Sequence, residues 1–250
     1  MLIGIAGIGG RMGQLLAREV PKAGATLVGG TMRAGDTAPS HVALFDDIEL
    51  LAKACDLVID FTHSSAVAHH AAALVATNTA WVLGTTGYGG ADRRAIEAAA
   101  QSIPLIAAPN YAPGVNLLMA LAEKLAAALP AADYDAEIVE MHHRQKIDAP
   151  SGTALGIGRA VASGRGQNFD DVAVTDRAGL RAAGAIGFAA LRGGQVVGDH
   201  TLIFAGTSEQ ITLGHKALDR GVFAAGAVRA ALWLNGKPPG RYTMGDVLGI

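Results

Sequence analysis

Short apolar runs alternate with segments of helical periodicity over the first 110 residues. The apolar runs have the length and composition of buried strands, and they are Leu2–Ala6, Thr26–Gly30, Leu57–Asp60, Trp81–Leu83 and Leu105–Ala107. The segments between them have apolar residues at helical spacing, and they are Arg11–Ala23, Asp46–Ala54, Ser65–Thr77 and Ala91–Gln101. Repeated strand–helix–strand order predicts an α/β fold in which helices cover a parallel sheet.

The pattern changes after Pro113. The spacing predicts a helix over Asn116–Leu129 that ends at Pro130, and a second helix over Ser151–Ser163 with Ser151 as its N-cap. Four predicted strands belong to this part: Ala136–Met141, Ile186–Leu191, Gln195–Phe204 and Glu209–His215. This order predicts an α+β domain with its own mixed sheet, followed by a helix over Val222–Leu234 that packs back on the first domain.

Composition excludes several classes of protein. Half of the 250 residues are hydrophobic and only 17% are charged, which is the reverse of the disordered signature. The 20 Lys and Arg residues are balanced by 22 Asp and Glu residues without a basic cluster, so we expect no nucleic-acid partner. The single cysteine, Cys55, cannot form an internal disulfide, and we expect it to be a small core residue.

Two long stretches lack Asp, Glu, Lys and Arg, namely residues 61–91 and 98–122. Each is interrupted by His, Thr, Gly, Pro or Asn, so neither predicts a membrane span. The segment Met1–Gly7 has no basic region and continues directly into a glycine motif, so it does not resemble a signal peptide. We therefore expect a cytoplasmic protein without a membrane partner.

A glycine-rich loop, Gly7–Gly13, follows the first predicted strand and opens the first helix. Such a loop lets the backbone approach a pyrophosphate, whose charge the N–H groups of the helix start stabilise. A tight turn without a ligand explains the motif alone, but its position after the first strand favours a dinucleotide site. Arg11 is a candidate phosphate contact or a solvated surface residue.

The end of the second predicted strand bears on cofactor choice. In many dinucleotide folds an acidic residue there binds the ribose 2′-hydroxyl, but here Thr31–Arg33 lacks a carboxylate and the next acid is Asp36. A guanidinium fits a 2′-phosphate, so Arg33 favours NADP(H), with a surface arginine as the alternative.

Two further loops, Gly84–Gly87 and Ala108–Tyr111, follow the fourth and fifth predicted strands. Both belong to the ligand edge of a parallel sheet. Their small and hydroxyl residues suit a nicotinamide carboxamide, and Tyr111 is a candidate to flank the ring. Ordinary loop chemistry is the alternative.

The densest polar segment runs from Glu140 to Thr153 and joins a strand end to a helix start. A helix N-terminus beside lysine and histidine predicts a carboxylate or phosphate site. His142 or Lys146 is suited to act as acid or base near neutral pH. Adjacent histidines on a strand point to opposite faces and no third ligand is spaced to join them, so we expect no metal.

The segment His142–Ala154 resembles the signature of the dihydrodipicolinate reductase family of bacterial lysine and diaminopimelate synthesis. The resemblance continues in order along nearly the whole chain, through Gly7–Gly13, Asp60–Thr62, Gly84–Gly87, Pro109–Asn116, Arg192–Thr201 and His215–Ala217. It implies a Rossmann domain over residues 1–112 plus 221–250, and a substrate-binding and tetramerisation domain over residues 113–220.

The resemblance also implies a reaction. A dicarboxylate, 4-hydroxy-tetrahydrodipicolinate, loses water, takes a hydride from NADPH or NADH at C4 and a proton at C3. By resemblance His142 is the catalytic acid/base and Lys146 the proton donor, while the substrate carboxylates are held by His143, Ser151, Gly152 and Thr153. The implied cofactor residues are Gly7, Ile8, Gly9, Gly10, Arg11, Met12, Gly84, Thr85, Thr86, Ala108, Pro109, Asn110 and Tyr111. The implied assembly is a homotetramer.

Two positions depart from the family pattern. Some relatives have a Glu-Arg pair where Met32-Arg33 stands, which weakens the case for tight NADH binding, and Gln145 replaces a histidine outside the catalytic positions. Three other functions use parts of the same pattern. A related amino-acid dehydrogenase does not need the His-His-x-x-Lys and Ser-Gly-Thr combination, a dinucleotide sensor needs no acid/base cluster, and a hydrolase needs a shared metal.

Overall fold

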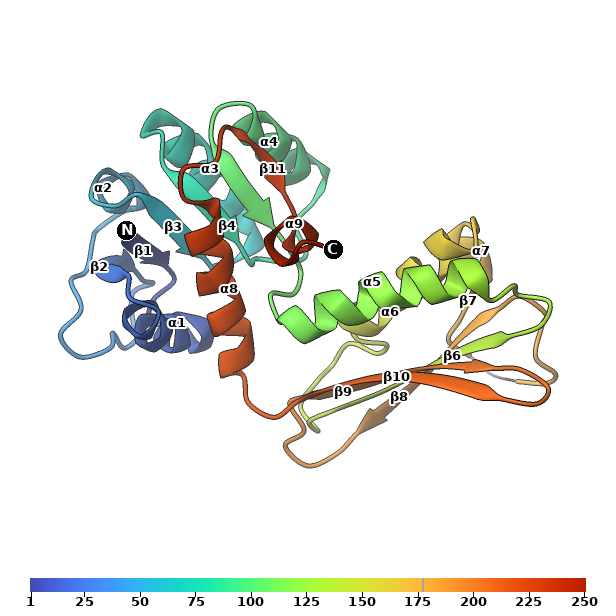
Figure 1. Ribbon diagram of the computed structural model, residues 1–250. Helices are drawn as coiled ribbons and strands as arrows, with labels where there is room; N and C mark the ends of the chain where they lie inside the picture. The colour runs from blue at the N-terminus through green and yellow to red at the C-terminus, as the bar shows by residue number, and fades with distance from the viewer. Residues whose placement is uncertain (177) are drawn as a thin grey trace. The chain divides into compact units, whose positions relative to one another are not determined.

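The chain folds into two compact units, which are shown together in Figure 1 and described separately below. The computed structural model describes residues 1–176 and 178–250. The first unit comprises Met1–Pro113 and Gly221–Gly249, and the second comprises Gly114–Arg220. Within the described residues, no helix has the length and apolar character needed to cross a bilayer.

A six-stranded, fully parallel sheet forms the centre of the first unit. Its order is β11-β5-β4-β3-β1-β2. The strands are β1 (Leu2–Ala6), β2 (Thr26–Thr31), β3 (Leu57–Asp60), β4 (Ala80–Leu83), β5 (Pro104–Ala107) and β11 (Gly240–Tyr242). The five predicted strands are confirmed, whereas β11 was missed because three residues are too few to show a period.

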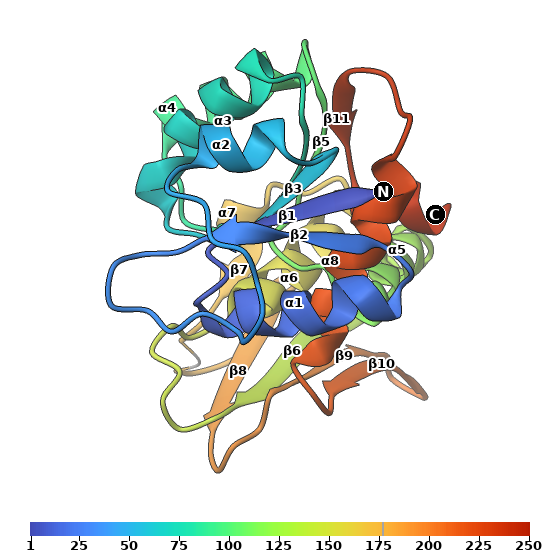
Figure 2. The same ribbon diagram turned by 90° about the vertical axis from the view of Figure 1, so that its left-hand side faces the viewer.

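Helices cover both faces of this sheet, as Figure 2 shows for α1 and α8 on one side and α2 and α3 on the other. The elements are α1 (Arg11–Lys22), α2 (Ile48–Lys53), η1 (Ser64–Ala66), α3 (Val67–Ala76), α4 (Gly90–Ala100), α8 (Gly221–Leu234) and α9 (Met244–Leu248). All four residues of β3 are buried, as expected for a strand covered on both faces. In the five longer strands, hydroxyl and charged side chains stand only at the strand ends, namely Thr26, Thr31 and Asp60.

The second unit contains a five-stranded mixed sheet of order β10-β9-β6-β8-β7, parallel among β6, β8 and β7 and antiparallel elsewhere. Its elements are α5 (Pro113–Ala128), β6 (Asp135–His142), α6 (Gly152–Gly164), α7 (Phe169–Val172), β7 (Ala173–Val174), β8 (Ile186–Arg192), β9 (Gly198–Ala205) and β10 (Gln210–Ala217). The predicted fold class, a Rossmann-type parallel sheet plus a mixed sheet, is confirmed. The predicted strand at Gln195 begins only at Gly198, and α5 begins already at Pro113, a residue that suits a first helical position.

Strand β6 has alternating buried residues, and the pattern continues from apolar to polar side chains. Every second residue is buried, and these are Ala136, Ile138, Glu140 and His142. The first two pack in the core beneath α5 and α6. The same face of the strand therefore presents a carboxylate and an imidazole where the apolar core ends.

Candidate active site

A cavity of about 650 Å³ lies at the carboxyl ends of the strands in the first unit. It is lined by Gly10–Met12 at the start of α1, Phe61–Ser64 after β3 and Gly84–Gly87 after β4. This is the edge at which parallel α/β sheets bind ligands. Six residues of the expected cofactor set line this cavity: Gly10, Arg11, Met12, Gly84, Thr85 and Thr86.

The glycine loop leaves the first turn of α1 open to a ligand. The N–H groups of Gly7 and Ile8 both donate to the Thr31 carbonyl, so they are not available to a phosphate. The N–H groups of Arg11 and Met12 belong to the first helical turn, where no intrahelical acceptor exists. A Cβ at Gly13 would lie 2.2 Å from the Gly7 carbonyl, so only glycine lets the helix pack this closely on its loop. The backbone thus fits the pyrophosphate of a dinucleotide.

Arg33 lies beyond the end of β2, where its side chain is 83% exposed. Its Nε lies 3.5 Å from a carboxylate oxygen of Asp36, and the Asp36 Cβ is 2.7 Å from where a Cβ would stand on Gly9. Asp36 follows the end of β2 by several residues, but the chain folds back so that its side chain lies beside Gly9 in the glycine loop. A cation and an anion both border the expected ribose position.

The Tyr111 ring is 1% exposed, which corrects the expectation that it flanks a nicotinamide. Its hydroxyl donates to the Leu83 carbonyl at 2.7 Å, and burial raises the pKa of this phenol well above its ordinary value. The side chain joins β4 to β5 within the core, so only the backbone of Tyr111 remains for a cofactor. Ile8 is likewise fully buried.

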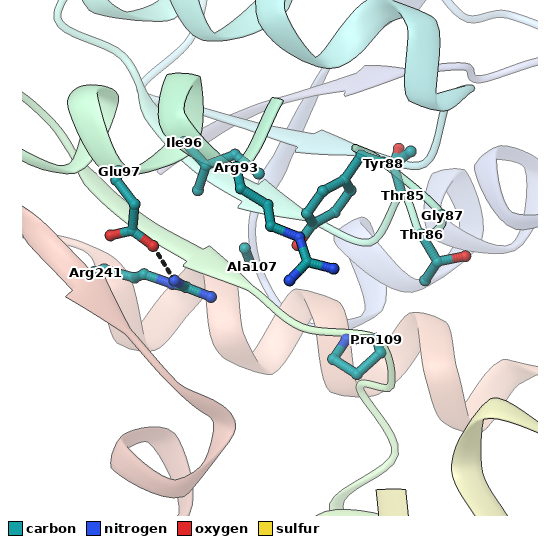
Figure 3. A pocket seen from close by; sticks show the side chains of 10 residues that line it. All are labelled: Thr85, Thr86, Gly87, Tyr88, Arg93, Ile96, Glu97, Ala107, Pro109 and Arg241. Carbon is teal, nitrogen blue, oxygen red and sulfur yellow. Dashed lines mark hydrogen bonds and ion pairs between the residues drawn. The ribbon is translucent and has the colours of Figure 1, made fainter. Parts of the chain in front are cut away.

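A second cavity of about 510 Å³ lies on the other side of the β4–α4 loop (Figure 3). Thr85, Thr86 and Gly87 line both cavities, and Pro109 lines this one. The Arg93 side chain extends into the opening beside Tyr88, while Arg241 pairs with Glu97 across it. Ala108 and Asn110 belong to the same β5 loop without lining either cavity.

A network of hydrogen bonds among Asp60, Thr62, His70 and Thr85 lies next to the first cavity. Asp60, which is fully buried at the end of β3, accepts from both the N–H and the hydroxyl of Thr62 and lies 2.7 Å from Nδ1 of His70. Thr85 in turn donates to the Thr62 carbonyl at 3.1 Å. The loops after β3 and β4 are therefore held together by side chains of the chain itself.

In the second unit, His142 is held by Glu140. Nδ1 of the imidazole lies 2.6 Å from Oε2 of the carboxylate, which is 1% exposed. Within residues 1–176 and 178–250, Nε2 makes no hydrogen bond, and a Cβ on Gly198 would come within 2.9 Å of it. Because Gly198 carries no side chain, this nitrogen stays open for proton transfer.

Glu140 also accepts from two other parts of the fold. Arg192 at the end of β8 donates to both carboxylate oxygens at 2.8 Å, and the Ser151 N–H donates to Oε1 at 3.0 Å. Burial opposes ionisation of Glu140, but the hydrogen bonds from Arg192 and His142 outweigh it and lower its pKa. The carboxylate is therefore ionised and joins His142 to the start of α6.

His200 on β9 completes this cluster. Its Nε2 lies 3.0 Å from the Ser151 hydroxyl, and its ring packs edge-on against His142 with centroids 5.1 Å apart. Burial and the neighbouring His142 lower the pKa of His200 to about 4. At neutral pH His200 is an uncharged partner for Ser151, which caps α6 as expected by accepting from the Ala154 N–H.

The other predicted site residues of this segment are Lys146, His143, Gly152 and Thr153. Lys146 pairs with Asp148 at 2.8 Å, and its charge is near enough to lower the pKa of His142, although burial is the larger cause. Nδ1 of His143 is buried without a partner among the described residues. Gly152 and Thr153 form the first turn of α6.

The sequence pattern does not identify Glu140, Arg192 or His200 as members of the site. One signal was present for Glu140, because a residue two positions from His142 on a strand shares its face. Arg192 stands opposite His142 in the β6–β8 register, and His200 stands opposite Glu140 in the β6–β9 register. Those pairings depend on strand order, which the sequence alone did not provide.

Across the described residues, no three His, Cys, Asp or Glu side chains are arranged to hold a metal ion.

Comparison with known proteins gives matches along the whole chain. Residues 1–111 match the family described as dihydrodipicolinate reductase, N-terminus, and residues 114–248 match dihydrodipicolinate reductase, C-terminus. The 4-hydroxy-tetrahydrodipicolinate reductase of Granulibacter bethesdensis is 59% identical over 99% of this chain and 97% of its own length. The reductase of the same name from Acidiphilium cryptum is also 59% identical over the same shares.

Solved structures agree with this result. Dihydrodipicolinate reductase from Paenisporosarcina sp. TG-14, solved with dipicolinate bound, superposes with a TM-score of 0.81 at 25% identity and covers 97% of both chains. Aspartate dehydrogenase from Thermotoga maritima gives a TM-score of 0.54 at 10% identity, over 95% of this chain and 98% of its own, so it shares the fold alone.

Proposed function

This chain belongs to the dihydrodipicolinate reductase family, and from that premise we propose the roles of its residues in the reduction of 4-hydroxy-tetrahydrodipicolinate to tetrahydrodipicolinate. The enzyme is an NAD(P)H-dependent oxidoreductase of lysine and diaminopimelate biosynthesis. Loss of water moves a proton from C3 of the substrate to the leaving hydroxyl at C4, and the reduced ring takes a proton at C3. When bound, the reduced nicotinamide supplies the hydride.

One observation carries the assignment of His142 as acid/base. Its Nδ1 faces a buried, ionised carboxylate, while its Nε2 makes no hydrogen bond with the part of the chain that the structure describes. A carboxylate accepts but does not donate, so it fixes the proton of the neutral imidazole on Nδ1 and leaves Nε2 as the acceptor. Lys146 is the second proton-transfer group, because its side chain is only 21% exposed and its charge is near enough to act on His142.

The substrate carboxylates are assigned to the start of α6 and to His143. The N–H groups of a helix N-terminus bind anions, and α6 begins at Gly152 with Thr153 in its first turn. The unpartnered Nδ1 of His143 fits a residue whose partner arrives with the substrate. The dipicolinate bound by the Paenisporosarcina reductase is a planar dicarboxylate of the same kind.

The cofactor is assigned to the first unit. The first turn of α1 and Arg11 would hold the pyrophosphate, and Gly84, Thr85 and Thr86 would hold the nicotinamide end. We assign NADPH a preference at least equal to that of NADH, because Arg33 offers a cation to the 2′-phosphate. Asp36 reduces this advantage, since it pairs with the same guanidinium.

The assembly and location are also proposals. The family resemblance supports a homotetramer, and the use of NAD(P)H, which the cell regenerates internally, supports a cytoplasmic location. Cell fractionation that finds the enzyme outside the cytoplasm would contradict the second.

The reaction is tested by NAD(P)H oxidation with substrate generated from pyruvate and aspartate semialdehyde by the preceding enzyme. We expect turnover that depends on both precursors, and we expect pyridine-2,6-dicarboxylate to inhibit it in competition with the substrate. Thr153→Val should weaken the binding of that inhibitor. Equal inhibition by pyridine-2-carboxylate would argue against a site for two carboxylates.

A further inference from the structure

Glu140 receives more donors than are needed to hold one histidine. Its two oxygens accept from Nδ1 of His142, from the Ser151 N–H and from both terminal nitrogens of Arg192. All four interactions favour the ionised carboxylate, since that form only accepts. Arg192 has further anchors in the Leu191 and Asp148 carbonyls at 2.6 Å each, so its guanidinium is fixed in place.

His142 is therefore surrounded by charges of both signs. On its own strand Glu140 favours the imidazolium, whereas Arg192 from β8 and Lys146 from the following loop disfavour it. Lys146 is itself paired with Asp148, and the neighbour on β9, His200, is uncharged at neutral pH. An isolated carboxylate 2.6 Å away would strongly stabilise the imidazolium, but this carboxylate is shared with a guanidinium.

We propose that Glu140 and Arg192 act as an opposed pair of positioning residues, in which Glu140 fixes the His142 tautomer and favours its protonation while Arg192 limits that effect. This inference rests on the proposed role of His142 as acid/base. The pair keeps Nε2 able both to take and to return a proton, because an acid/base works best when neither protonation state is strongly favoured. Through Ser151, the same carboxylate aligns the histidine with the helix start that binds the substrate.

The pair makes a prediction of opposite sign for its two members. Glu140→Gln removes the charge that supports the imidazolium, so the pKa of His142 should fall. Arg192→Gln removes a cation and leaves the carboxylate to His142, so the pKa should rise. The fall in Glu140→Gln should be about 1 to 3 pH units, the range for an opposite charge within about 4–6 Å. The rise in Arg192→Gln should be smaller, because the guanidinium bonds Glu140 and not the imidazole itself.

The pKa is measured by NMR titration of histidine-labelled protein, which does not depend on turnover. His142→Gln identifies the resonance. Two variants serve as controls. Glu137→Gln makes the same substitution on the other face of β6, where the carboxylate pairs with Arg181. Arg192→Lys changes the side chain but retains its positive charge. Neither control should move the His142 titration by more than a small fraction of the effect in its test variant.

Kinetics supply the second readout. The limb of the pH profile of kcat/KM that belongs to His142 should move down in Glu140→Gln and up in Arg192→Gln, with NADPH affinity unchanged in both. Equal titrations in wild type and both variants, or shifts of the same sign, would overturn the opposed pair. Absence of turnover in wild type with normal shifts would instead refute the proposed function alone. If Glu140→Gln fails to fold, the upward shift in Arg192→Gln still decides the proposal.

Discussion

At the scale of single residues, the candidate chemistry depends on His142, which bonds the buried carboxylate of Glu140, and on Lys146, which pairs with Asp148. We expect His142→Gln and Lys146→Met each to lower kcat by about 100- to 10,000-fold, the contribution of a positioned acid or base. NADPH affinity, measured by fluorescence titration, should stay close to that of wild type.

Lys216→Met is the matched control for the lysine, because Lys216 is 73% exposed on β10 and its nearest carboxylate oxygen, on Asp199, is 3.7 Å away. It should retain full turnover. Normal turnover in His142→Gln or Lys146→Met would remove that residue from the mechanism.

His200 predicts how stability depends on pH. Its pKa is lowered to about 4 in the folded protein, whereas an unfolded histidine titrates near 6.5. Between these two pKa values His200 is protonated in the unfolded chain but not in the folded chain. The free energy of unfolding is therefore unaffected by this residue above about pH 6.5 and falls as the pH drops toward 4. The largest loss from this residue is about 3 kcal/mol at 1.36 kcal/mol per unit.

His200→Gln keeps a polar side chain near Ser151 but does not titrate. Urea unfolding at pH 7 and pH 4.5 should show a smaller loss of free energy in this variant than in wild type. Equal losses in both proteins would show that His200 does not cause the acid sensitivity.

Arg33 is expected to influence cofactor choice. Arg33→Ala should lower NADPH affinity by about 10-fold, the lower end for a charge-assisted bond, because its side chain is 83% exposed and solvent screens the contact. NADH affinity should not change, and the salt dependence of NADPH binding should flatten. Loss of both affinities together would transfer the role to Arg11.

At the scale of elements, the packing of α8 on the loop after β5 depends on one small residue. A Cβ on Gly226 would lie 1.9 Å from the Tyr111 carbonyl, so Gly226→Ala cannot be accommodated without moving the helix. We expect a destabilisation of at least about 1–3 kcal/mol, the range for overpacking, measured by chemical denaturation.

Helix propensity alone predicts the opposite sign, since alanine is favoured over glycine by about 1 kcal/mol in a helix interior. The neighbouring Ala225→Gly, at an exposed position of the same helix, should cost about that amount. A stabilised Gly226→Ala would show that the close approach does not exist.

The strands that form the candidate site illustrate why register matters at this scale. Glu140 and His142 alternate with Val139 and Met141, so a shift of one residue would exchange the buried polar pair for an apolar one. The pairing of His142 with Arg192 likewise requires β6 and β8 to be neighbours. The cluster around Glu140 is therefore a property of the mixed sheet.

At the scale of the whole molecule, the proposed homotetramer has a direct test. Light scattering after size exclusion should give a mass four times that of the 25.4 kDa chain. The mass should not change with dilution over the range used in the activity assay. A stable monomer or dimer with full turnover would contradict the tetramer and leave the reaction proposal intact.

The sequence by itself determined the elements and the chemistry that local pattern encodes. The alternating apolar runs defined five strands of the parallel sheet, the glycine loop marked the start of α1, and Ser151 was identified as the cap of α6. Each depends on residues close in sequence, where hydrophobic period, backbone sterics and capping act directly.

The tertiary structure alone decided what surrounds these groups. Tyr111 is buried, so its ring is not accessible to a cofactor. Strand order brings Arg192 and His200 next to Glu140, although they are 52 and 60 positions away in the chain. The folded loop brought Asp36 back over Gly9. Contacts of this kind depend on which strands pair and which faces are covered, and these are fixed by packing of the whole chain rather than by any local preference.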